Sequence, residues 1–208
     1  MEERSLHKGA VYQRDWDKKL IRIIAFDDKD AVFDTWCPGT SSWDIDSLSR
    51  TISYLRLPIP VLLKNAIYIR TEEYAEAEMK IHRPDLPLSF VQATAFEWAS
   101  TCPNDIEQLL GASTQSEGVA TLLAQSIDLP AVYLSPFSPK GGMKPLVLVE
   151  ALNGRSFTAG ELLLCSARLQ SEHVRDSKVT KGVGIYRLGI NRMIPTYYLW
   201  GAKGRAQL

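Results

Sequence analysis

The amino-acid sequence predicts an α+β protein, and three observations support this fold class. Residues 9–70 consist of β-branched and aromatic runs separated by Asp, Lys, Gly and Pro, a pattern typical of short strands and turns. Segments with helix-capping patterns follow in the second half of the chain. The stretch GVGIYRLGINRMIPTYYLWGAKGR, residues 182–205, then mixes glycines, aromatic residues and arginines, and it predicts a C-terminal β-hairpin.

The N-terminal strands are expected in the runs GAVYQRD, LIRIIAFD, AVFDTW, TISYLRL and AIYIR. In LIRIIAFD both faces of the strand are mostly apolar, as they are inside a small closed barrel. The acidic stretch Asp27–Asp30 is better explained as a hairpin turn than as a calcium loop, because the glycine and the ligand spacing of such a loop are missing. We therefore expect a compact β-barrel of about five strands, similar in fold class to Tudor-like modules.

A helix is predicted from Thr71, as its cap, to His82, because the Arg83-Pro84 pair stops helices. The proline-rich connector after it suggests a domain boundary, with a barrel and its trailing helix in 1–83 and a mixed α+β domain in 84–208. In the second domain, capping patterns predict helices over 105–110 and 115–127 and a third helix opened by Thr158 with Glu161. Strands are expected at AVYL and LVLVEAL.

The composition is that of a globular protein, with 45% hydrophobic and 23% charged residues. The N-terminal segment is polar and no apolar run is long enough to span a membrane, so we expect a cytoplasmic protein without membrane contact. The three cysteines and three histidines are scattered, and this spacing predicts neither a metal site nor a disulfide framework. No cofactor-binding loop is recognisable, so we expect no cofactor.

Charge is distributed unevenly although the formal net charge is zero. Residues 1–100 hold 13 basic and 16 acidic side chains, residues 101–154 hold 2 and 5, and residues 155–208 hold 9 and 3. No Lys or Arg occurs between Arg83 and Lys140. The acidic middle of the chain would suit a basic protein partner bound through residues 84–139, whereas the basic end would suit a polyanion.

Two sequence patterns that would indicate DNA recognition or catalysis are present only in part. Residues 105–125 resemble a helix-turn-helix, but they hold no Lys or Arg for phosphate contacts, and an ordinary helical hairpin explains them better. Glu78 and Lys80 form the E-x-K of metal-dependent nucleases, yet on a helix they point in different directions. A solvated helix face is the better interpretation. Cys37 has no predictable base beside it, so the sequence favours a non-catalytic role.

Trp36 and Trp43 flank a loop at the edge of the expected barrel. Two tryptophans in such a place can form an aromatic cage for a cation or a stacking surface for a base, or they can close the core of the small domain. The sequence leaves both alternatives open.

The C-terminal segment carries the functional hypothesis. A helix followed by a basic, aromatic hairpin is the arrangement of a winged DNA-binding domain, in which arginines contact phosphates and tyrosines stack on bases. We expect a non-catalytic accessory or regulatory protein that binds DNA or RNA, with a protein–protein adaptor or immunity-type factor as the alternative and a metal-dependent nuclease as a third, less favoured one. The residues expected to contact nucleic acid are Arg175, Lys178, Lys181, Arg187, Arg192, Tyr197, Lys203 and Arg205.

Overall fold

The computed structural model describes residues 6–43, 52–98, 104–110, 121, 123–136, 144–173 and 180–200. The chain forms two compact units, the first made of residues 1–88 with 188–193 and the second of residues 89–187 with 194–208. The turn of the C-terminal hairpin thus belongs to the first unit. The fold is α+β, as expected from the sequence. The expected division into domains 1–83 and 84–208 stays a prediction about independent folding.

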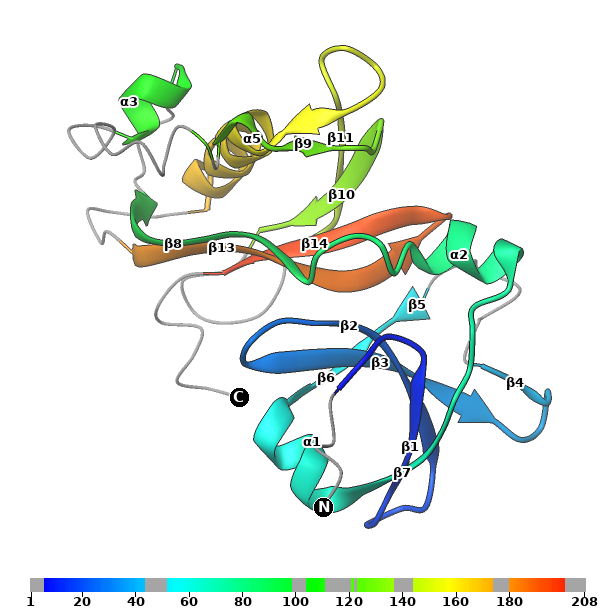
Figure 1. The fold of residues 1–208 in the computed structure, drawn as a ribbon. Helices are drawn as coiled ribbons and strands as arrows, with labels where there is room; N and C mark the ends of the chain where they lie inside the picture. The colour runs from blue at the N-terminus through cyan, green and yellow to red at the C-terminus, as the bar shows by residue number, and fades with distance from the viewer. Residues whose placement is uncertain are drawn as a thin grey trace. The chain divides into compact units, whose positions relative to one another are not determined.

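The first unit is built on an antiparallel sheet with the strand order β4-β3-β2-β1-β7, and β6 pairs with β3 in addition (Figure 1). These strands are β1 (Ala10–Arg14), β2 (Leu20–Phe26), β3 (Asp30–Cys37), β4 (Ser42–Trp43), β6 (Leu55–Pro58) and β7 (Ala66–Thr71), and the short β5 (Ile52–Ser53) pairs with the end of the C-terminal hairpin. The pairings among the described residues do not close this sheet, so the expected Tudor-like barrel is not confirmed.

The turn between β2 and β3 forms as the sequence predicts. One carboxylate oxygen of Asp27 accepts hydrogen bonds from the backbone N–H groups of Lys29 and Asp30, both at 2.8 Å. An aspartate that satisfies the amides of its own turn removes their desolvation cost and fixes the hairpin locally. The β2–β3 register that follows places Arg22 opposite Asp34.

Apolar side chains of the first unit form two buried clusters. One contains Tyr12, Ile21, Ile23, Phe33 and Leu62 among its members, and the other contains Ile24, Val32, Tyr54, Leu88 and Ile190. Ile190 lies near the end of the strand that enters the hairpin turn, and the backbone N–H of Tyr54 also donates to the carbonyl of Leu188 at 2.8 Å. Each fully buried aliphatic or aromatic side chain contributes roughly 1.5–3 kcal/mol, so the hairpin turn is an integral part of this unit.

In the described part of the first unit, two short helices accompany the sheet, α1 (Ile59–Asn65) and α2 (Glu76–His82). The prediction that Thr71 caps the second of them is wrong, since Thr71 ends β7. The cap is Ala75, whose backbone N–H donates to the Glu78 carboxylate at 3.0 Å. The helix ends at Arg83, which adopts a left-handed conformation with φ of 44°, just before Pro84.

The second unit holds a sheet in which β11, β10, β14 and β13 follow one another, with β8 also paired to β13. Its elements are β8 (Ser89–Trp98), α3 (Ile106–Leu110), β9 (Ser126–Ile127), β10 (Ala131–Ser135), β11 (Val147–Glu150), β12 (Phe157–Thr158), α5 (Ala159–Ser171), β13 (Thr180–Asn191) and β14 (Ile194–Trp200). β10 runs parallel to β14, whereas its pairing with β11 is antiparallel. The hairpin expected at the end of the chain is confirmed as β13 and β14.

The helix α5 begins as expected, because the Thr158 hydroxyl accepts a hydrogen bond from the Glu161 backbone N–H at 3.0 Å. The reciprocal half of the capping box is wrong: the Glu161 carboxylate accepts from the backbone N–H of Leu152 at 2.6 Å. The helix expected over 115–127 stops short of β9, which starts at Ser126. Most of that helix and of the helix-turn-helix outline lies outside the described residues. None of the helices in the described ranges is long and apolar enough to cross a membrane.

Candidate functional site: a basic and aromatic pocket

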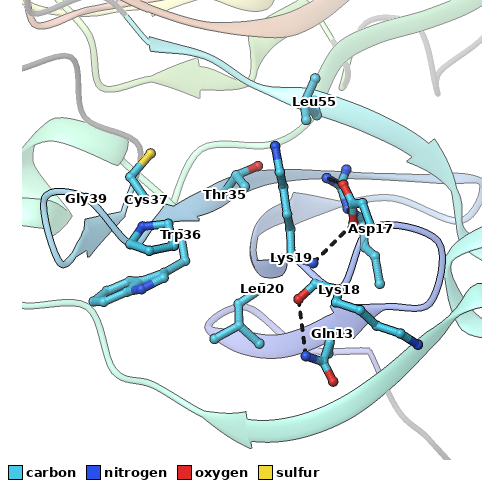
Figure 2. Close-up of a pocket in the computed structure, with 12 residues that line it drawn as sticks. Gln13, Asp17, Lys18, Lys19, Leu20, Thr35, Trp36, Cys37, Gly39 and Leu55 are labelled. Carbon is cyan, nitrogen blue, oxygen red and sulfur yellow. Dashed lines mark hydrogen bonds and ion pairs between the residues drawn. The ribbon is translucent and has the colours of Figure 1, made fainter.

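A pocket of about 720 Å³ opens in the first unit where the turn between β1 and β2 meets the end of β3 (Figure 2). Its lining includes Arg14, Lys18, Lys19, Trp36, Cys37 and Leu55. In Figure 2 the Lys19 side chain extends between Thr35 and Asp17, and Trp36 and Cys37 lie to one side of it. The pocket thus brings together a tryptophan predicted as a site residue and basic side chains that were not.

The basic side chains of this pocket are not equally available to a ligand. Arg14 is buried and donates to Asp17 through Nε at 3.0 Å and through a second, closer contact from the same guanidinium. Lys18 has an exposed side chain and lies 3.7 Å from an Asp15 oxygen, a surface ion pair that stabilises little. Among the described residues, no carboxylate lies within 4.0 Å of Lys19 Nζ. Lys19 and Lys18 are therefore the cations that the pocket offers to an anionic group.

Asp17 is tied to the basic side of the pocket. Its oxygen accepts the Lys19 backbone N–H at 3.2 Å as well as the Arg14 guanidinium. Desolvation raises the pKa of Asp17, but these hydrogen bonds and the charges of Arg14 and Lys19 outweigh it, so the pKa is lowered. Asp17 stays ionised and cancels the charge of Arg14, which leaves the lysines as the net positive groups.

Trp36 and Trp43 face each other across the β3–β4 pairing, but they do not enclose an empty cage. Their ring centroids are 5.3 Å apart at an interplanar angle of 77°, an edge-to-face contact. Trp43 is buried, its indole N–H donates to Glu72 at 2.9 Å, and its ring lies 4.6 Å from the guanidinium carbon of Arg22. Trp43 therefore belongs to the interior, whereas the half-buried Trp36 reaches the pocket wall.

The aromatic pair that does enclose a cation is Trp43 with Tyr74, and the cation is Arg22 of the same chain. The Arg22 guanidinium carbon lies 4.3 Å from the Tyr74 ring centroid, and Arg22 is only 1% exposed. Its Nη2 donates to Asp34 at 2.8 Å and to Glu78 at 3.0 Å. Two carboxylates and two rings thus satisfy a buried guanidinium and join α2 to the sheet.

The environment of this buried cluster shifts the pKa values of its acids in opposite directions. Burial raises the pKa of Asp34 to about 6, although the hydrogen bond and charge of Arg22 oppose the shift. For Glu78, which is more exposed, desolvation also raises the pKa, but hydrogen bonds from Arg22 and from the Ala75 backbone outweigh it and the pKa is lowered. Burial raises the pKa of Tyr74 far above its usual range, so that ring stays a neutral phenol.

Glu78 is consequently not part of a solvated helix face, and that interpretation of the E-x-K pattern is wrong for this residue. Its carboxylate is committed to Arg22, while Lys80 forms an exposed ion pair with Glu76 at 2.7 Å. Side chains two apart on α2 point in different directions, as the sequence predicts. Within the described ranges, no group of three or more His, Cys, Asp or Glu side chains is arranged to hold a metal ion.

The residues expected to contact nucleic acid do not share one environment in the described part of the structure. Arg187 and Tyr197 are buried, with 1% and 0% of their surfaces exposed. Arg192 is exposed at the hairpin turn, where it has a φ of 50°. Lys181 lies on β13 opposite Glu97 of β8, and its side chain is outside the described part of the structure. Arg175, Lys178, Lys203 and Arg205 lie outside the described residues altogether.

Sequence reasoning missed the segment DWDKK, residues 15–19, which joins β1 to β2. Trp16 in this segment is 54% exposed, and the guanidinium carbon of Arg14 lies 5.0 Å from its ring centroid. A tryptophan placed in a polar turn beside two lysines was the available signal, since large aromatic residues in such turns have little core to pack against. Arg22 is the one charged residue in the apolar strand LIRIIAF, and this isolated charge was likewise a signal for a buried ion pair.

The function of this pocket has to be inferred from its geometry, because comparisons with known proteins offer no relative to compare it with. No protein-family model matches the chain, and no significant match was found among curated proteins or solved structures.

Proposed function

We propose that this protein binds nucleic acid without catalysing a reaction on it. The observation that carries the proposal is the turn between β1 and β2, where the exposed Trp16 stands in the same five-residue segment as Lys18 and Lys19, beside a pocket that Trp36 lines. Lysines supply the phosphate contacts that dominate affinity, and exposed tryptophans supply stacking surfaces for bases.

The hairpin contributes to the same proposal through its turn. Arg192 is exposed and belongs to the first unit, the unit that also contains the pocket. The excess of 9 basic over 3 acidic side chains in residues 155–208 supports attraction of a polyanion. Because Arg187 and Tyr197 are buried, they act in this proposal by supporting the hairpin and not by touching the polymer. Arg175, Lys178, Lys181, Lys203 and Arg205 remain proposed phosphate contacts.

Binding is measured by fluorescence anisotropy with labelled single- and double-stranded DNA and RNA over a series of salt concentrations. The proposal expects an affinity that falls steeply as salt rises, because cations condensed on the phosphates are released on binding. Changing Arg175, Lys178, Lys203 and Arg205 together to Ala tests the contribution of the C-terminal segment. If the protein binds none of the four polymers at low salt, the proposal is wrong.

A protein–protein adaptor is the second candidate, and exposed apolar strands at sheet edges favour it. β11 ends the second sheet, and around it Leu146, Val147 and Leu148 are each more than a third exposed. β7 ends the first sheet with Ile67, Tyr68 and Ile69 exposed. Apolar edge strands readily pair with strands of another chain. A stoichiometric complex that survives nuclease treatment in a pull-down, without salt-dependent nucleic-acid binding by the purified protein, would favour the adaptor.

A further inference from the structure

The pocket and the β1–β2 turn that lines it also bear on which form of nucleic acid, single-stranded or double-stranded, binds there. We propose that the pocket receives one unpaired base of a single strand, stacked on Trp36, while Lys18 and Lys19 contact the adjoining phosphates. This inference rests on the proposed function and deepens it, since it assigns a site and a strand preference that nucleic-acid binding alone does not require.

The pocket is large enough for a planar aromatic group, and one of its walls is an aromatic side chain. Its volume of about 720 Å³ lies within the range of roughly 300–1,000 Å³ that sites for small organic ligands occupy. Trp36 lines it and is held in place by the edge-to-face contact with the buried Trp43. A ring that is fixed before the ligand arrives loses little conformational freedom on binding, so stacking on it is favourable.

The positive charges around the pocket favour a ligand with phosphate groups over a positively charged ligand. Arg14 is already neutralised by Asp17, whereas Lys19 lies in the lining with no described carboxylate within 4.0 Å of its ammonium group. The exposed Lys18 precedes it, and its ion pair with Asp15 spans 3.7 Å between solvated groups that a phosphate can replace at little cost. In this proposal Lys19 and Lys18, which both line the pocket, supply the positive charge for the phosphates on either side of the stacked base.

Trp16 offers a second stacking surface in the same turn. It is 54% exposed and is approached by the Arg14 guanidinium at 5.0 Å. A base next to the one in the pocket can stack there, because consecutive bases of an extended single strand are free to separate. Inside a duplex each base is paired and stacked on both faces, so entry into the pocket would first require unpairing and unstacking, which opposes binding. The site should therefore prefer single strands.

The test compares two labelled oligonucleotides of about twelve residues, one a plain thymidine strand and the other carrying abasic sites at every position. Both present the same phosphates, and only the first presents bases. Wild-type protein is expected to bind the thymidine strand about tenfold more tightly, because bases that stack on aromatic side chains add to the affinity. A duplex of the same length should bind more weakly than the single strand at equal salt concentration.

Two variants locate the effect. Trp36→Leu keeps apolar volume against Trp43 but removes the stacking ring in the pocket, so it should lose the part of the preference for bases that Trp36 contributes while still binding the abasic strand. Trp36→Phe keeps a ring and should retain the preference. Since each preference is a ratio measured on one protein, a change in the amount of folded protein cancels.

The outcomes separate the two proposals. Equal binding of the thymidine and abasic strands by the wild-type protein, or an unchanged preference in Trp36→Leu, overturns the base-in-pocket inference and leaves nucleic-acid binding standing. Tighter binding of the duplex than of the single strand overturns it as well. If the wild-type protein binds neither strand nor the duplex at low salt, the proposed function itself is wrong and this inference falls with it.

Discussion

Arg22 and Asp34 lie opposite each other on β2 and β3 and form an ion pair at 2.8 Å in which neither side chain is more than 1% exposed. A charge buried this deeply is tolerated only when its partner and its hydrogen bonds are in place. Glu78 and the rings of Trp43 and Tyr74 complete the surroundings of the guanidinium. The cluster connects α2, β2, β3 and β4 of the first unit, and several testable properties depend on it.

Replacing Arg22 by Met should destabilise the protein by about 3–5 kcal/mol, because Asp34 would remain buried without its counter-charge. Urea denaturation followed by circular dichroism measures the change. The double variant Arg22→Met with Asp34→Asn removes both charges and should be less destabilised than the single variant, which measures the coupling of the pair. A loss below about 1 kcal/mol in Arg22→Met would show that water reaches the cluster.

Stability should depend on pH through Asp34. Burial raises the pKa of this carboxyl from 3.8 to about 6, so the folded state binds more protons than the unfolded state between these values. Stability therefore falls as pH rises through this window, by roughly 3 kcal/mol in total, and levels off above it. Asp34→Asn cannot ionise and should lack this decline.

The neighbouring groups Arg22, Glu78, Tyr74 and His82 remain in both proteins, so the difference between wild-type and Asp34→Asn stability isolates the Asp34 contribution. The lowered pKa of Glu78 acts in the opposite direction, with stability lost as pH falls below its unfolded value of 4.5. Unfolding free energies measured at several pH values between 4.5 and 7 test the prediction. Parallel curves for the two proteins would contradict it.

Gly9 should be nearly irreplaceable. Its φ is +81°, and a Cβ built there would lie 2.3 Å from the backbone carbonyl oxygen of Glu72, which cannot move aside without breaking the adjoining hydrogen bonds. Gly154 is a matched control, because its φ is +68° but no atom lies within 4 Å of a built Cβ. Gly154→Ala should cost about 1 kcal/mol of left-handed strain, and Gly9→Ala clearly more. Equal melting temperatures for the two variants would be inconsistent with the close approach.

Local features of this fold were predictable from sequence, whereas the sites that depend on distant partners were not. The Asp27 turn, the Thr158 cap and the terminal hairpin are encoded within a few residues, and all three form. The Arg22 cluster draws partners from β3 and α2, whose distances no local pattern specifies. Sequence alone could therefore suggest a buried charge at Arg22 but not name Glu78 as its partner.

The aromatic and basic candidates show the same limit. Alternation along a strand predicts only which residues share a face, whereas tertiary packing decides which face is buried, and the side chains of Arg187 and Tyr197 both lie inside. The pairing of Trp36 with Trp43 brings the two rings together, yet the cation beside Trp43 belongs to the protein itself. The turn holding Trp16 supplies Asp17, Lys18 and Lys19 to the pocket lining, and the other residues of that lining come from distant segments that no local pattern identifies.

The most direct test of nucleic-acid binding at this turn is the salt dependence of affinity for a single strand, measured for the wild-type protein, for Lys18→Ala with Lys19→Ala, and for Lys29→Ala with Lys64→Ala. The second pair removes the same charge from exposed positions of the first unit outside the pocket lining. If Lys18 and Lys19 contact phosphates, their replacement should make the negative slope of log affinity against log salt shallower by about 0.7 for each lost contact, while the control pair leaves it near the wild-type value. Identical slopes for all three proteins would contradict the account.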